Sequence, residues 1–158
     1  MRRTRTLETP IGRLYLESED GFLTRVSFTD LEEGAAPDAV LNNAADQIRE
    51  YFSGARKTFD LPLRPAGTPF QQSVWRALQA VPYGKTASYR DMARAIGNEN
   101  ACRAVGGANH VNPIPIVIPC HRVVGARGAL TGYAGGIEIK KQLLELDGDI
   151  EMDLYLPQ

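Results

Sequence analysis

Cysteine and histidine are scarce in this sequence. Its 158 residues contain two of each, and residues 1–101 contain neither. Two cysteines are too few for a disulfide framework, so in a reducing compartment each is either a small buried hydrophobe or a reactive thiol. A structural zinc site needs several Cys or His ligands, so none can form in the first half of the chain. We expect no metal.

The sequence also lacks a long apolar run. No stretch approaches the length needed to span a bilayer, and the basic residues 1–6 continue into Leu7-Glu8-Thr9-Pro10 without the apolar core of a secretory signal. With 43% hydrophobic and 23% charged residues, the composition is typical of a soluble globular protein of one or two small domains. We expect a cytoplasmic protein with no membrane association.

The charge is distributed unevenly along the chain. Residues 1–62 carry 8 basic and 11 acidic side chains, residues 63–144 carry 10 and 3, and residues 145–158 carry 0 and 5. The net charge of −1 therefore conceals a middle segment of +7. Such a segment is a candidate surface for a polyanion, although an uneven surface without function would give the same count.

The first 60 residues have the pattern of a small α+β unit. Apolar and polar residues alternate over the first 30 positions around a turn at residues 19–21, which predicts a β-hairpin or meander. Apolar residues at helical spacing from Leu41 to Phe52 predict a helix that ends at Gly54. The proline-rich residues 61–69 indicate a linker. We therefore place the domains at residues 1–65 and 66–158.

Helical patterns dominate the next segment. Thr68 is a candidate N-cap, with Pro69 in the first turn, for a helix that includes Trp75 and stops at residues 82–84. Trp75 fits the core better than a base-stacking surface. Two shorter patterns, at about residues 89–96 and 100–108, have the shape of a helix-turn-helix, which also occurs in proteins that do not bind DNA. The second is rich in Ala and Gly, with Arg103 as its one long cation.

An extended segment stiffened by proline, residues 112–119, leads to Cys120. A free thiol has a pKa near 8.5, and an adjacent cation or a helix N-terminus lowers it. His121 and Arg122 are candidates for this effect. The alternative is a buried cysteine followed by a histidine and an arginine on the surface, and the adjacency alone does not decide between them.

The sequence Ile118-Pro-Cys-His-Arg-Val-Val124 resembles the active-site signature of the O6-alkylguanine-DNA alkyltransferases. The resemblance is close over residues 68–148 and loose over the first lobe. It extends through Tyr83-Gly-Lys-Thr-Ala-Ser-Tyr89, Arg103-Ala-Val-Gly-Gly-Ala108, Asn112-Pro113 and Gly132-Tyr-Ala-Gly-Gly136 to Lys140 and Leu143-Leu144.

The resemblance implies an α+β fold, with a small ribonuclease-H-like N-terminal lobe and a helical C-terminal lobe of the winged helix-turn-helix type. It also implies double-stranded DNA as the partner, bound through the minor groove by a monomer. Arg103 would enter the base stack in place of an extruded nucleotide, with Ala104 beside it on the thin helix. Tyr89 would help to push the damaged base out, and Asn112 would tie the DNA-reading helix to the active-site loop.

The same resemblance implies the substrate pocket and the chemistry. The carbonyls of Cys120 and Val123 would accept from the guanine amine, the Tyr89 hydroxyl and the Ala134 amide would donate to the base, and Tyr133 and Pro115 would form the walls. His121 would take the thiol proton through a water, the Cys120 thiolate would attack the alkyl carbon, and Tyr89 would protonate the leaving guanine. Transfer would be irreversible, once per molecule and without a cofactor, and O4-alkylthymine is a second candidate substrate.

One position departs from the family pattern. Asp147 stands where the family usually has a glutamate that orients the histidine, and its side chain is shorter by about 1.5 Å. We expect Asp147 still to orient His121, because a carboxylate is present at the matching position.

Three other functions compete with alkyl transfer. A lesion-binding protein of the same fold would have another residue in place of Cys120. A transcription regulator would need a sensing module that this sequence lacks. A cysteine hydrolase is disfavoured because Cys120 and His121, as sequence neighbours, cannot easily point at one another. Cys102 has no role that we can derive, and we interpret it as structural.

Overall fold

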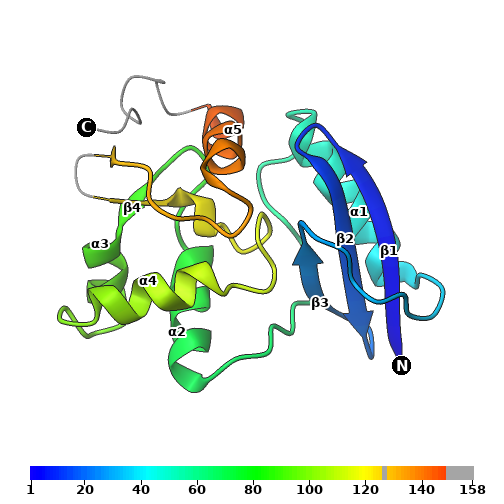
Figure 1. The fold of residues 1–158 in the computed structure, drawn as a ribbon, viewed down its shortest axis with the longest axis horizontal. Helices are drawn as coiled ribbons and strands as arrows, with labels where there is room; N and C mark the ends of the chain where they lie inside the picture. The colour runs from blue at the N-terminus through cyan, green and yellow to red at the C-terminus, as the bar shows by residue number, and fades with distance from the viewer. Residues whose placement is uncertain (126–127, 149–158) are drawn as a thin grey trace. The chain divides into compact units, whose positions relative to one another are not determined.

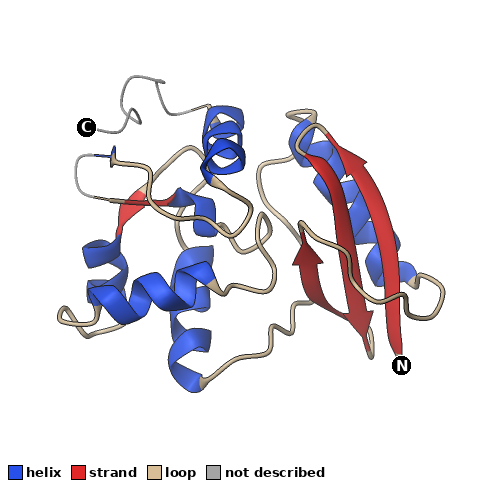
Figure 2. Cartoon of the chain, viewed as in Figure 1, coloured by secondary structure: helices blue, strands red, loops and turns tan. Residues whose placement is uncertain are grey.

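The computed structural model describes residues 1–125 and 128–148, which form an α+β fold (Figures 1 and 2). The chain divides into two compact units. The first contains Met1–Ala66 and Pro113–Val117, and the second contains Gly67–Asn112 and the described residues from Ile118 onward. None of the helices in the described residues combines the length and the apolar character that a bilayer crossing requires.

The first unit is a three-stranded antiparallel sheet with one helix on it (Figure 1). The strands β1 (Arg2–Thr9), β2 (Gly12–Glu19) and β3 (Phe22–Ser27) form the meander that the alternating pattern predicts. The helix α1 (Ala39–Phe52) begins at Asp38, whose side chain accepts from the Leu41 amide. The apolar stripes of both elements meet in a core that contains Leu7, Leu14, Leu16, Leu23, Val26, Leu41, Ala44, Ala45, Ile48 and Tyr51.

Two segments from outside the meander bond to β3. The Leu23 amide donates to Pro62 O at 2.8 Å, and the Arg64 amide donates to Leu23 O at 2.9 Å. Further along β3, the Val26 amide donates to Pro113 O at 2.9 Å. Residues 113–117 thus group with the first unit, although our sequence-based limits put them in the second domain. Those domain limits stay a prediction.

The second unit is mainly helical. It contains α2 (Pro69–Gln79), α3 (Tyr89–Ala95), α4 (Cys102–His110), the short 3-10 helix η1 (Cys120–Arg122) and α5 (Ile137–Asp147). Strands β4 (Ala87–Ser88) and β5 (Val123–Val124) pair in parallel.

Local sequence signals set the helix starts. Thr68 and Gln71 form a capping box at the start of α2, with Pro69 in the first turn, as predicted. Ser88 and Asp91 form a second capping box at the start of α3. Trp75 is in the core, as its position on α2 indicated, and its Nε1 donates to Ala108 O at 2.9 Å.

Candidate active site

Cys120 opens η1, directly after the proline-rich segment. Its side chain is buried, and its amide donates to Ile118 O at 2.7 Å. Burial raises the pKa of the Cys120 thiol, while a hydrogen bond from the Asn112 side chain, the Lys140 charge and the Tyr133 side chain act in the opposite direction. Burial outweighs the lowering that we expected from the neighbours of Cys120. The resting residue is therefore a neutral thiol, which needs a base to become a nucleophile.

Two buried asparagines hold the backbone of the cysteine loop. The Asn109 amide Nδ2, on α4, donates to Cys120 O at 3.3 Å. Asn112 follows the end of α4, and its Nδ2 donates to Ile118 O at 2.9 Å. The structure thus brings Asn112 to the active-site loop, where the resemblance implied it would be, and adds Asn109 as a second link between α4 and this loop.

His121 and Asp147 are in contact inside the second unit. His121 Nε2 lies 3.1 Å from Asp147 Oδ2, and both side chains are almost fully buried. Burial lowers the pKa of His121, and Arg122 and Lys140 lower it further, although Asp147 raises it. A neutral imidazole that donates its Nε2 proton to Asp147 keeps a lone pair on Nδ1, which has no hydrogen-bond partner among the described residues. This tautomer suits a general base.

Arg122 is also buried, so the interpretation of residues 121–122 as surface residues is wrong. Its Nε donates to Asp147 Oδ2 at 2.8 Å, and its Nη1 donates to Val81 O at 3.0 Å. The guanidinium also lies over the Tyr83 ring, 5.6 Å from the centroid. Arg122 therefore binds the carboxylate partner of His121.

The cation that acts on Cys120 is Lys140, from the buried face of α5. Its Nζ donates to Val123 O at 2.6 Å and to Thr131 O at 3.4 Å. Burial lowers the pKa of Lys140 to about 8, and the Cys120 thiolate opposes this lowering. A protonated Lys140 thus stabilises a thiolate at Cys120.

The second unit also contains the two predicted site tyrosines, Tyr89 and Tyr133. Tyr89 is the first residue of α3, and its hydroxyl shares a hydrogen bond with Thr131 Oγ1. Tyr133 is buried, and its side chain acts to lower the pKa of the Cys120 thiol. Ala134, next to Tyr133, is exposed. The second unit thus contains a thiol, an imidazole with a carboxylate partner, an ammonium group and two phenol hydroxyls.

Helix α4 has two different faces. Val105, Ala108 and Asn109 are buried, whereas Arg103 and Ala104 are exposed. At Gly106, an added Cβ would lie 3.7 Å from the Tyr89 ring, which shows how closely α4 approaches α3. The exposed face therefore presents one long cation beside small residues, as the sequence indicated.

Comparison with known proteins identifies the family. The ribonuclease-like domain of 6-O-methylguanine DNA methyltransferase matches residues 3–65, and the DNA-binding domain of the same family matches residues 69–149. The chain belongs to this methyltransferase family. The predicted α+β fold, with a ribonuclease-like lobe followed by a DNA-binding lobe, is thereby confirmed.

Relatives of this methyltransferase family match along most of the chain. The methylated-DNA–protein-cysteine methyltransferase of Methanosarcina acetivorans is 47% identical over 89% of this chain and 95% of its own. The constitutive enzyme of that name from Bacillus subtilis is 46% identical over 90% and 93%. The crystal structure of the Mycobacterium tuberculosis O6-methylguanine methyltransferase is 43% identical, with a TM-score of 0.85 and 98% of both chains covered. The structure of that organism's OGT in complex with DNA is 45% identical, with a TM-score of 0.85 over 92% and 93%.

Pro115 is the one predicted pocket residue that the structure groups elsewhere. It is buried, but it belongs to residues 113–117 of the first unit, whereas Cys120, Val123 and Tyr133 belong to the second. Its role as a pocket wall stays a prediction.

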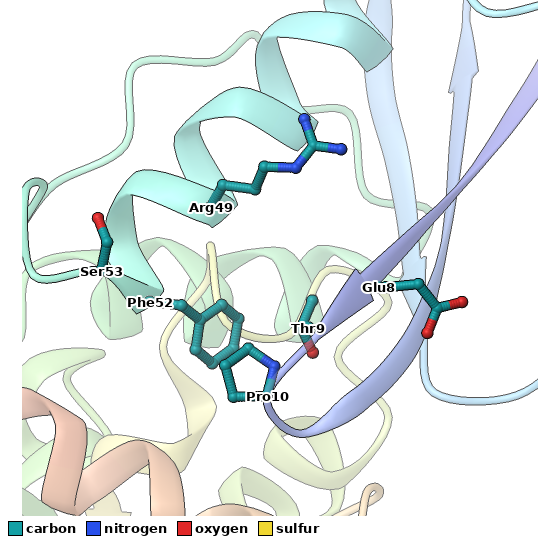
Figure 3. A pocket seen from close by; sticks show the side chains of 6 residues that line it. All are labelled: Glu8, Thr9, Pro10, Arg49, Phe52 and Ser53. Carbon is teal, nitrogen blue, oxygen red and sulfur yellow. The ribbon is translucent and has the colours of Figure 1, made fainter.

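The first unit contains a cavity of about 240 Å³ between α1 and the turn after β1 (Figure 3). It is lined by Glu8, Thr9, Pro10, Arg49, Phe52 and Ser53. None of the site residues predicted from the sequence lines it. Within the part of the chain that the structure describes, no three His, Cys, Asp or Glu side chains group to hold a metal ion.

Sequence reasoning assigned no role to Asn109 or Lys140. For Lys140 a signal was available, because residues 140, 143, 144 and 147 recur at helical spacing and form the buried face of α5. A lysine on the buried face of a helix rarely lacks a polar partner. For Asn109 we find no comparable signal.

Proposed function

We propose that this methyltransferase repairs DNA by moving the alkyl group of O6-alkylguanine to Cys120. The observation that carries the proposal is the buried Cys120 thiol in a loop with His121, whose Nε2 lies 3.1 Å from the Asp147 carboxylate. Family membership supports the reaction class, because relatives at 46–47% identity are named methylated-DNA–protein-cysteine methyltransferases.

In this proposal, His121 activates the nucleophile. His121 Nδ1 takes the thiol proton through a water molecule, and Lys140 stabilises the thiolate that forms. The thiolate attacks the alkyl carbon, an S–C bond forms, and the C–O6 bond breaks with its electron pair left on guanine. The Tyr89 hydroxyl protonates the leaving base. Each step uses a residue of this chain, so no cofactor is required.

Access to O6 requires the base to leave the stack, since a protein thiol cannot reach a stacked guanine. We propose that α4 binds the minor groove, which is only about 6 Å wide and therefore suits a helix face of small residues. Arg103 would fill the gap in the stack and Ala104 would lie in the groove. The DNA complex of the Mycobacterium tuberculosis relative supports DNA as the partner.

Transfer is proposed to occur once per molecule. A thioether is a poor leaving group, and no second nucleophile in the described site would regenerate the thiol. O4-alkylthymine is a second proposed substrate. The proposed pocket for the alkylated guanine consists of Tyr89, Pro115, Cys120, Val123, Tyr133 and Ala134. We further propose a monomer in the cytoplasm, where a reducing environment keeps Cys120 a thiol.

Intact-mass analysis with a duplex that carries one O6-methylguanine tests this function. We expect a gain of one methylene on the peptide that contains Cys120, in at most one equivalent per protein. Cys120→Ser should show no gain, and Cys102→Ser, which changes the other cysteine, should react as the wild type does. Binding of the damaged duplex without any mass gain would instead favour a lesion-recognition protein.

A further inference from the structure

One carboxylate oxygen of Asp147 serves two donors. Asp147 Oδ2 accepts from Arg122 Nε at 2.8 Å and lies 3.1 Å from His121 Nε2. The side chain of Asp147 is 1% exposed, that of Arg122 is 7% exposed, and that of His121 is 0% exposed. Both the ion pair with Arg122 and the contact with His121 therefore depend on the position of this oxygen.

Arg122 is itself held from several sides. Its Nη1 donates to Val81 O at 3.0 Å, and its guanidinium lies over the Tyr83 ring. The Tyr83 hydroxyl in turn donates to Leu146 O at 3.0 Å, on the residue that precedes Asp147. The guanidinium thus connects the chain after α2 to the last turn of α5, where Asp147 lies.

The charges also favour this arrangement. A carboxylate buried without a partner is strongly unfavourable, and a neutral imidazole supplies no compensating charge. Asp147 draws a proton toward His121, whereas Arg122, Lys140 and burial all oppose protonation of the ring. Arg122 therefore supplies the positive charge that the buried Asp147 carboxylate needs and that a neutral His121 does not provide.

We propose that Arg122 is a positioning residue for alkyl transfer, which fixes the Asp147 carboxylate so that His121 remains a neutral base with Nδ1 available. This inference rests on the proposed function and deepens it. Without Arg122, the buried Asp147 charge would be balanced by protonation of His121. A protonated His121 cannot accept the thiol proton, so transfer would require a higher pH.

The test is the pH dependence of the single-turnover rate constant with free O6-benzylguanine, which separates the chemistry from DNA binding. For Arg122→Gln we expect the acid limb to move to higher pH by roughly one unit, with about tenfold slower transfer near neutral pH and recovery above it. Arg122→Lys keeps the charge, but an ammonium group cannot reproduce the guanidinium's separate hydrogen bonds to Asp147 and Val81 O. Its pH profile should therefore fall between those of the wild type and Arg122→Gln. Arg94→Gln, which removes an exposed arginine paired with Glu99 in the same unit, is the matched control and should follow the wild type.

Nitrogen NMR of the His121 ring supplies a readout that needs no substrate. The sequence has only two histidines, so His110→Gln assigns the signals. We expect His121 to titrate at a higher pH in Arg122→Lys and Arg122→Gln than in the wild type. If the wild type transfers no alkyl group, the proposed function fails, and the ring titration still tests Arg122.

A uniform loss of rate without a shifted acid limb, together with an unchanged His121 titration, would overturn the inference and leave Arg122 with a structural role. Removing one partner of a buried ion pair is strongly destabilising. If Arg122→Gln does not fold, Arg122→Lys alone tests the proposal. A folded Arg122→Lys protein whose pH–rate profile and His121 titration match those of the wild type would contradict it.

Discussion

Replacing Lys140 by methionine should make the protein more stable and less reactive. Methionine has a similar length and no charge, so it fills most of the same buried volume. Lys140 is fully buried on α5 and acts on Cys120 through its charge. The substitution therefore separates the free energy of folding from the chemistry of transfer.

The magnitude follows from the pKa of Lys140. Burial lowers it from 10.5 to about 8, which corresponds to about 3 kcal/mol of unfavourable free energy for the charged form in the folded protein. Methionine removes this term but leaves Val123 O without its donor, at a cost of about 1–2 kcal/mol. We expect a net gain of about 1–2 kcal/mol in the free energy of unfolding at pH 7.

The sign of the pH dependence provides a second check. The folded protein releases the Lys140 proton near pH 8, whereas the unfolded chain keeps it until about pH 10.5. The wild type therefore gains stability from this group as the pH rises through that window, and the advantage of Lys140→Met should shrink there and then reverse.

Guanidinium denaturation at pH 7 and at pH 9.5 measures the stability gain and its pH dependence. In a separate assay, the single-turnover rate of Lys140→Met at pH 7 should fall about tenfold, because the pKa of the Cys120 thiol rises when the Lys140 charge is removed. A Lys140→Met protein that is less stable at pH 7 and transfers at the wild-type rate would refute this reasoning. Lys140 would then matter only as a hydrogen-bond donor to Val123 O.

Three further predictions concern the same unit. Cys120→Ser should abolish transfer and leave duplex affinity largely intact, because the nucleophile and the exposed face of α4 are separate; mass analysis and a binding titration check this. Arg103→Ala should repair duplex DNA poorly but react almost normally with free O6-benzylguanine, and equal losses on both substrates would contradict the role of Arg103 in holding the base out. Asp147→Asn should slow single-turnover transfer because His121 loses its carboxylate, whereas Asp147→Glu should stay close to the wild type; three superimposable pH profiles would exclude an orienting role.

Short-range features of the fold could be predicted from the sequence. The start of α2 depends on Thr68, Pro69 and Gln71, which lie within four positions, so a local pattern specifies it. The alternation along β1–β3 likewise reflects burial on one face of a sheet. The cysteine loop was found through a family signature that is contiguous in the sequence.

The partners of the buried charges could not be predicted. Arg122 bonds to Val81 O, 41 positions earlier, and to Asp147, 25 positions later. Such contacts depend on how α2, η1 and α5 pack, and no local pattern contains that information. Arg122 was therefore interpreted as acting on its neighbour Cys120, whereas the charge that acts there comes from Lys140 on α5.

The pairing of residues 113–117 with the first unit has a consequence for synthesis on the ribosome. Ile114 and Ile116 are fully buried, and Pro113 accepts from the Val26 amide, yet these residues are made only after α2, α3 and α4. The early meander therefore emerges before the segment that bonds to the Val26 amide and groups with it in the folded protein, and a fragment that stops at the linker would lack this segment. We expect such a fragment to bind chaperones or aggregate, and the first unit to reach its final form only when most of the polypeptide has been translated.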